Sequence, residues 1–156
     1  MRNRVTAGLL AGAAGTTALN AVAYADMALR GRPASRVPEQ LVDRLGLPLG
    51  DDERTANRRE AVAALLGIGV GLGVGAAYGL AGRTPRTPAG LVAGAVALAA
   101  AASLAGDGPP VALGLTDPRT WTAADRLSDV VPHLTYGAVT AVTYDRLTRR
   151  RRREVR

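Results

Sequence analysis

Apolar residues fall along this chain in long blocks that are separated by shorter polar stretches. The blocks at 61–82 and 89–106 contain no charged residue, and the block at 5–29 contains a single acid, Asp26. A helix rises 1.5 Å per residue, so about 20 residues cross a hydrocarbon core roughly 30 Å thick. The pattern predicts transmembrane helices over all three blocks, with the third near the lower length limit.

A fourth span is predicted at 128–147, although this segment is more polar than the other three. It contains Asp129, His133 and several threonines, so it crosses only if its polar face is buried against the other helices. We therefore expect an all-α, polytopic membrane protein, with a four-transmembrane-helix bundle at 1–148 and a basic tail at 149–156.

Polar segments with turn signals separate the predicted spans. In the long connection at 30–60, residues 38–45 predict a short helix on the membrane surface. The sequence RTPRTP at 83–88 predicts a tight turn, and DGPP at 107–110 predicts the end of the third span, since proline does not continue a helix. Thr122 and Asp125 have the spacing of a capping box at the start of the last helix.

The first block also imitates a secretory signal peptide. Arg2 and Arg4 precede it, and the small residues Ala23 and Ala25 before Asp26 resemble a cleavage site. The block is longer than a typical signal core and is interrupted by glycines, which favours a retained span. Cleavage stays the alternative.

Glycines recur every four residues in the second block, which forms the strongest pattern in the chain. On a helix such GxxxG repeats make one ridge against which a neighbouring backbone packs closely. A nucleotide-binding glycine loop is the weaker alternative, because no GxGxxG register fits the block. We predict that helices pack through Gly8, Gly12, Gly67, Gly71, Gly75, Gly79, Gly90, Gly94 and Gly137.

Composition supports the membrane interpretation and locates the charge. The chain has 19 glycines and no phenylalanine, which suits close helix contacts in lipid better than a soluble core. Its net charge is +7, but residues 146–156 hold seven arginines against one acid. We expect this tail to bind anionic headgroups and both termini to be cytoplasmic in a bacterial-type inner membrane, and we expect no nucleic-acid partner.

The third span, its connection and the last helix resemble the YagU-like family of small bacterial inner-membrane proteins. The residues that carry the resemblance are LVAGAVALAA at 91–100, GLTDP at 114–118, Trp121, and the helix that contains SDVVPHL and YDRLTRR. The resemblance implies a multi-span inner-membrane protein without an established activity.

Few residues are candidates for chemistry. Asp129 and His133 are one helical turn apart, an arrangement that suits a proton relay or half of a metal site. Asn20 and Asp26 on the first span complete the candidate polar site. One histidine does not build a metal site alone, so a structural hydrogen bond across helices is the stronger interpretation of His133, and no metal is predicted. Three tyrosines, Tyr24, Tyr78 and Tyr144, are predicted to form an interfacial belt.

Two functions follow from these patterns. The leading hypothesis is a structural or accessory membrane component that associates through its glycine ridge, as a homo-oligomer or in a larger complex. The alternative is a small transporter or proton-coupled permeation protein that uses Asp129 and His133. With no cysteine and one histidine, no catalytic constellation can be assembled, so we expect neither an enzyme nor a cofactor.

Overall fold

A computed structural model of the chain describes residues 2–50, 52–82 and 87–154, and all of its regular elements over those residues are helices. The long helices are α1 (Arg2–Arg30), α3 (Thr55–Ala81), α4 (Pro88–Ala112) and α5 (Ala123–Glu154), and α2 (Val37–Arg44) is short. Most of the turn predicted at 83–88 lies outside the described residues, as do the tail's side chains from residue 150 onward.

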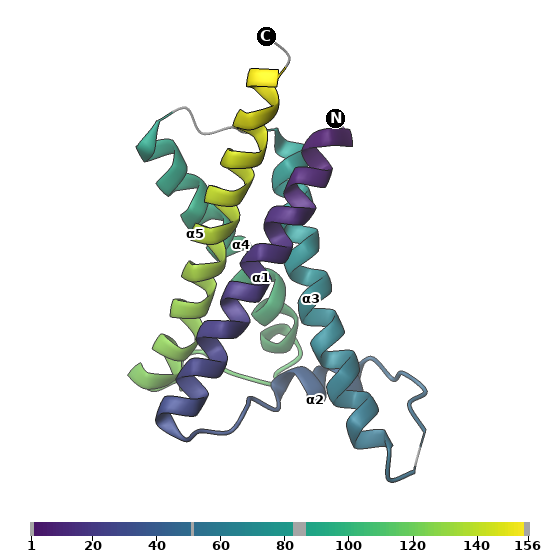
Figure 1. The fold of residues 1–156 in the computed structure, drawn as a ribbon. Helices are drawn as coiled ribbons and strands as arrows, with labels where there is room; N and C mark the ends of the chain where they lie inside the picture. Colours follow the sequence, from purple (N-terminus) through teal and green to yellow (C-terminus); the bar gives the residue numbers. More distant parts are fainter. Residues whose placement is uncertain (1, 51, 83–86, 155–156) are drawn as a thin grey trace.

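The four long helices alternate in direction and form an antiparallel bundle (Figure 1). α1 begins and α5 ends at the same end of the bundle, while α2 and the loops beside it lie at the other end. α1 packs along both α3 and α5, and α5 packs along α4. α2 lies against α3 and α4 and buries Val42, so the predicted short helix is confirmed.

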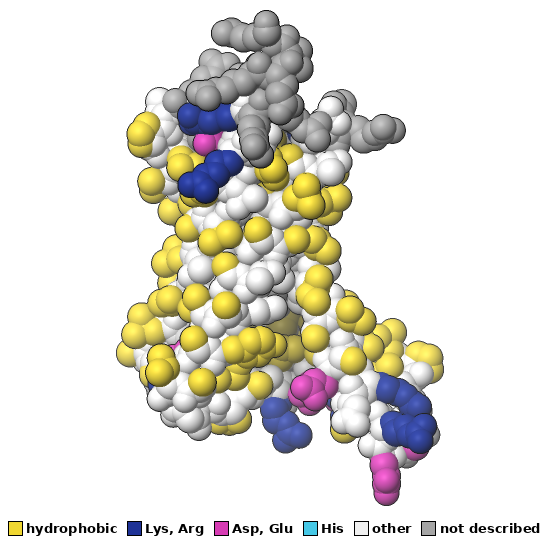
Figure 2. Space-filling view, in the orientation of Figure 1, with side chains coloured by type: hydrophobic (Ala, Val, Ile, Leu, Met, Phe, Trp, Pro, Cys, Tyr) yellow, Lys and Arg dark blue, Asp and Glu magenta, His cyan; other side chains and the backbone are white. Residues whose placement is uncertain are grey.

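Three of the helices are long and apolar enough to cross a membrane: Asn3–Arg30 of α1, all of α3 and all of α4. α5 has the length but carries too many polar side chains to meet the same condition, so the fourth predicted span stays a prediction. Figure 2 shows hydrophobic side chains around the middle of the bundle and charged side chains gathered toward its ends. This distribution is consistent with a membrane protein.

α4 continues through the segment where its end was predicted. It includes Pro109 and Pro110, so the predicted end at residue 106 was wrong. A proline inside a helix removes one backbone hydrogen bond, but these two lie in the last turn, where the N–H of Leu113 still donates to the carbonyl of Pro109 at 3.0 Å. The longer helix makes Asp107 a helical residue rather than part of a loop.

Glycines on α1 and α3 bring the two backbones into contact. An added Cβ at Gly75 would meet the backbone of Gly8 and Gly12, and one at Gly79 would meet the backbone of Gly8. Gly67, at the other end of the ridge, has no atom within 4 Å of such a Cβ. The two helices are therefore in closest contact near the end of the bundle where the chain begins, and they separate toward α2.

A second close contact joins α4 and α5. An added Cβ at Gly137 would meet the backbone of Ala95 and Ala99. Gly94 lies against the hydroxyl group of Tyr78, which would be 2.6 Å from an added Cβ. Both glycines thus allow α4 to approach its neighbours closely.

Tyrosines supply the large side chains of the bundle interior. Tyr136 and Tyr144 on α5 are 1% and 0% exposed, and the Tyr144 ring meets that of Tyr78 edge to face at 5.1 Å. The predicted interfacial belt was therefore wrong for Tyr144, which is turned into the bundle and packs with the small side chains of Ala7 and Ala11. Tyr24 is 64% exposed, as a belt residue would be.

Candidate functional site

Two of the predicted polar residues meet on α5, one turn apart. The Nδ1 atom of His133 lies 3.3 Å from Oδ1 of Asp129, and the two side chains are 17% and 20% exposed. The helical spacing alone brings them together, since positions i and i+4 share one face. The capping box at the start of this helix is confirmed: the N–H of Asp125 donates to Thr122 Oγ1, and the N–H of Thr122 donates to Asp125 Oδ2.

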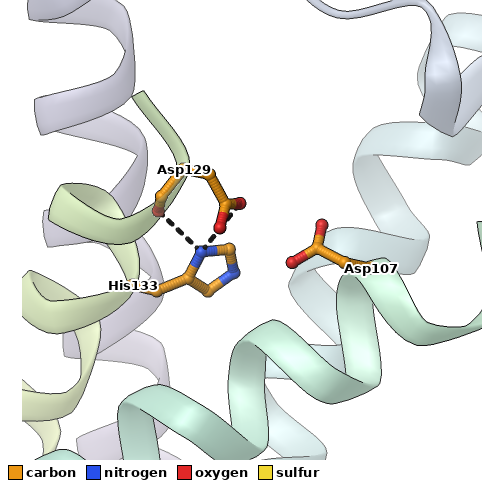
Figure 3. Close-up of side chains that lie close together, drawn as sticks. All are labelled: Asp107, Asp129 and His133. Atoms are coloured by element: carbon orange, nitrogen blue, oxygen red, sulfur yellow. Dashed lines mark hydrogen bonds and ion pairs between the residues drawn. The ribbon is translucent and has the colours of Figure 1, made fainter. Parts of the chain in front are cut away.

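The backbone of Asp129 fixes the orientation of the imidazole. Its carbonyl oxygen lies 2.9 Å from Nδ1 of His133. A carbonyl oxygen only accepts, so this hydrogen bond places the proton on Nδ1 and leaves the lone pair of the neutral ring on Nε2. Figure 3 shows the Nε2 side of the ring turned away from Asp129 and toward Asp107.

Asp107 faces this pair from α4 (Figure 3). One candidate ligand atom from each of Asp107, Asp129 and His133 lies within 4.8 Å of the other two. Ser103, one turn earlier on α4, donates from Oγ to Asp107 Oδ2 at 3.0 Å, which holds that carboxylate in place. We call Asp107, Asp129 and His133 the polar cluster.

The polar cluster is rich in acceptors. Its two carboxylates and the Nε2 lone pair of His133 all offer electron pairs. Asp107 on α4 faces His133 on α5. Acceptors that face one another repel unless a cation lies between them. The arrangement can therefore bind a positive ion.

Asp107 was missed in the sequence because it stood in a segment that predicted a helix end. DGPP contains the residues that usually stop a helix, so the acid was assigned to a loop. The signal that could have found it is the spacing of Ser103 and Asp107, which places both side chains on one face if the helix continues. The structure adds this acid to the predicted pair.

Asp26 lies at the same end of the bundle but has other partners. Its Oδ2 accepts hydrogen bonds from Nε of Arg32 at 2.6 Å and from Oγ of Ser128 at 2.9 Å. Arg30 bridges the same groups, 3.3 Å from Asp26 Oδ1 and 2.7 Å from Ser128 Oγ. Asp26 thus ties the end of α1 to the first turns of α5.

Asn20 is half-buried on α1. It follows Gly12 and Thr16 at four-residue spacing, on the side of the helix that faces α3. At this level α3 has already separated from α1, as the open surroundings of Gly67 indicate. Within the described part of the chain, no hydrogen bond joins Asn20 to His133. Of the four predicted polar residues, the structure brings only Asp129 and His133 into one cluster.

Comparison with known proteins identifies no relative of this chain. No family model, no curated protein and no solved structure matches the chain. The resemblance to the YagU-like family therefore stays a prediction.

Proposed function

We propose that this chain is a four-span inner-membrane protein that acts as a small cation transporter, with the polar cluster as its ion-binding site. The observation that carries the proposal is the position of Asp107, which faces the Nε2 lone pair of His133 from a neighbouring helix. Ionisable side chains within a membrane bundle are costly to keep, so each is by default a candidate for an ion or substrate pathway.

The burial pattern of α5 supports its crossing the membrane as a fourth span. Its outward side carries large apolar side chains that are between 43% and 61% exposed, namely Leu127, Val130, Val131 and Leu134. Two of its polar side chains point the other way: Thr140 is fully buried, and the Tyr136 hydroxyl donates to the Gly71 carbonyl at 2.6 Å. A helix that is polar only toward its neighbours satisfies the requirement of the bilayer.

Hydroxyl groups continue from the polar cluster along the inner face of α5. Tyr136, Thr140 and Tyr144 follow His133 at intervals of three or four residues, so they share one face, and all three are buried. Thr140 Oγ1 and Tyr144 Oη have no hydrogen-bond partner among the described residues. Buried hydroxyls without partners suit a path along which water or a cation passes.

Charged residues close both ends of this face. From Asp129 to Asp145 the helix rises about 24 Å, at 1.5 Å per residue, which is somewhat less than the hydrocarbon core of roughly 30 Å. Asp145 is buried and pairs with Arg149 at 2.7 Å. With both termini in the cytoplasm, as the Arg-rich tail favours, the polar cluster lies toward the opposite membrane surface.

The hypothesis of association through the glycine ridge has less support. Three of its four members, Gly71, Gly75 and Gly79, face α1 of the same chain. An added Cβ at these positions would meet Thr16 or backbone atoms. A helix face that is already covered by another helix of the same chain is not accessible to a second copy of the protein. Association is therefore not needed to explain these glycines.

Flux through proteoliposomes tests the proposal. The purified chain is reconstituted with a proton-sensitive and a divalent-cation-sensitive dye in the lumen, and wild type is compared with His133→Ala and Asp107→Asn. We expect wild type to move protons or a divalent cation faster than protein-free vesicles, and both variants to fall to the background rate.

The matched control is Asp117→Asn. Asp117 lies in the loop between α4 and α5 and pairs with Arg119 at 3.0 Å, outside the polar cluster, so this variant should keep the wild-type rate. Wild-type vesicles that leak no faster than empty ones would exclude transport.

A further inference from the structure

We infer that the polar cluster is a binding site for a divalent first-row transition-metal ion. The inference rests on the proposed function for its role, because it names the class of cation that the transporter takes. Binding itself is measured separately from flux, so the two proposals can fail independently.

The three side chains are arranged as ligands of one ion. Their candidate ligand atoms lie within 4.8 Å of one another. Bonds of about 2.0–2.2 Å in a tetrahedral site put ligand atoms roughly 3.4 Å apart, so the carboxylates must close by about 1 Å or a little more. Rotation of the two side chains would supply this movement, and the Asp129 carboxylate, whose Oδ1 lies 3.3 Å from Nδ1 of His133, must turn toward Nε2 to join the ion.

Hydrogen bonds from neighbouring groups orient two of the three ligands. Nδ1 of His133 is held by the carbonyl oxygen of Asp129 at 2.9 Å, which leaves Nε2 to bind the ion. Asp107 Oδ2 is held by Ser103 Oγ at 3.0 Å, which leaves Oδ1 free. Ligating histidines and carboxylates in proteins have such partners, which fix their orientation and strengthen binding.

The donor set selects the class of metal. One imidazole nitrogen with two carboxylate oxygens suits Zn²⁺, Fe²⁺ or Mn²⁺, whereas Mg²⁺ and Ca²⁺ prefer oxygen ligands alone and Cu⁺ prefers sulfur. The two carboxylates carry the charge that a divalent ion neutralises. Within a membrane bundle this neutralisation matters more than in water, because a low dielectric strengthens the repulsion between unpaired like charges.

The site remains open on one side. Three protein ligands leave at least one coordination position for water, and the His133 and Asp129 side chains are 17% and 20% exposed. Open positions are typical of sites where ligands exchange, whereas structural zinc sites are closed by four protein ligands. The ion can therefore enter and leave from the end of the bundle where α4 ends and α5 begins.

Metal binding to the full-length chain in detergent, with any affinity tag removed, tests the inference. Zn²⁺ binding is followed by calorimetry, and Co²⁺ binding by its visible absorption bands, which report nitrogen and oxygen ligation. We expect one ion per chain, with Mg²⁺ in large excess failing to displace it. Asp107→Asn and His133→Gln should each weaken binding at least tenfold.

Two further variants distinguish a built site from a general loss of structure. Ser103→Ala removes the hydrogen bond to Asp107 but no ligand, and should weaken binding about 10-fold, the lower end of the range for such outer partners. Asp117→Asn should bind as wild type does. Thermal unfolding of each metal-free variant shows whether the bundle is intact, and Ser103→Ala carries the test if a ligand variant does not fold.

The outcomes separate the two proposals. Saturable binding that the ligand variants lose, in a protein that moves no ion through vesicles, would keep the metal site and overturn the transporter. Proton flux that depends on His133, in a protein with no saturable Zn²⁺ or Co²⁺ binding, would overturn the metal site alone. Equal affinity in wild type, Asp107→Asn and His133→Gln would also overturn it.

Discussion

The contact between α1 and α3 and the contact between α4 and α5 both depend on glycine, yet only one of them leaves room for chemistry. Along α1 and α3, Gly8, Gly12 and Gly75 bring backbone against backbone. Along α4 and α5, Gly137 makes one such approach, but the helices then present Asp107 and His133 to each other. The α1–α3 contact is made without charged side chains. The α4–α5 contact includes ionisable side chains, which close packing does not require.

The difference indicates what each contact contributes. Small residues in van der Waals contact are the usual source of helix association in lipid. Partly buried carboxylates stabilise little, because desolvating them offsets what their interactions return. The α1–α3 contact therefore accounts for the fold, and the polar cluster is better explained by binding than by stability.

The largest effect is expected from an alanine placed in the α1–α3 contact. Gly75→Ala puts a methyl group against the backbone of Gly8 and Gly12, so the two helices must move apart. Overpacking of this kind costs about 1–3 kcal/mol, to be measured as a loss of unfolding free energy in detergent.

Gly73→Ala is the matched control on the same helix. An added Cβ there has nothing within 4 Å, so we expect no loss, and a gain of up to about 1 kcal/mol from helix propensity. Equal destabilisation by the two variants would show that α1 does not pack on this face of α3.

The sequence indicated a packing face on α3, because the signal of its glycines is periodic. Gly71, Gly75 and Gly79 at four-residue spacing indicate one face of a helix wherever that helix lies. What the spacing could not supply was the partner, because a ridge of glycines accepts another helix of the same chain as readily as one from a second copy. For the same reason, the ridge could not show that Gly67 lies beyond the contact.

The polar cluster was only half predictable. Asp129 and His133 form a local pair, which helical spacing reveals, but Asp107 joins them from another helix, and its place depended on α4 continuing through two prolines. Local propensity predicted a stop there, and packing against α5 outweighed it. Burial of Tyr144 escaped prediction for a similar reason, since the residues that it packs with, Ala7 and Ala11, lie on another helix.

A smaller effect is expected where α5 meets α3. Tyr136→Phe removes the hydroxyl that donates to the Gly71 carbonyl at 2.6 Å, at a cost of about 1 kcal/mol. Tyr144→Phe removes a buried hydroxyl that has no partner among the described residues, so it should leave the unfolding free energy unchanged or raise it. The same detergent unfolding experiment measures both.

These two variants also examine the proposed path along α5. If the hydroxyls of Tyr136 and Tyr144 serve ion movement, both substitutions slow flux even though only the first lowers stability. Wild-type flux in both variants would remove these hydroxyls from the path while leaving the polar cluster in place.

The smallest effect is expected in the first turn of α5, which precedes Asp129 and His133 on the same helix. Hydrogen bonds from the Thr122 hydroxyl and N–H hold the pKa of the Asp125 carboxyl below its usual range. A group whose pKa is lower in the folded state stabilises above its unfolded pKa, near 3.9, and loses that contribution as pH falls through the folded value. Carboxyl-carbon NMR should therefore give Asp125 a lower pKa in wild type than in Thr122→Ala. An unchanged Asp125 titration in that variant would contradict the capping contact. Because the residue is exposed, we expect the global unfolding transition to respond very little.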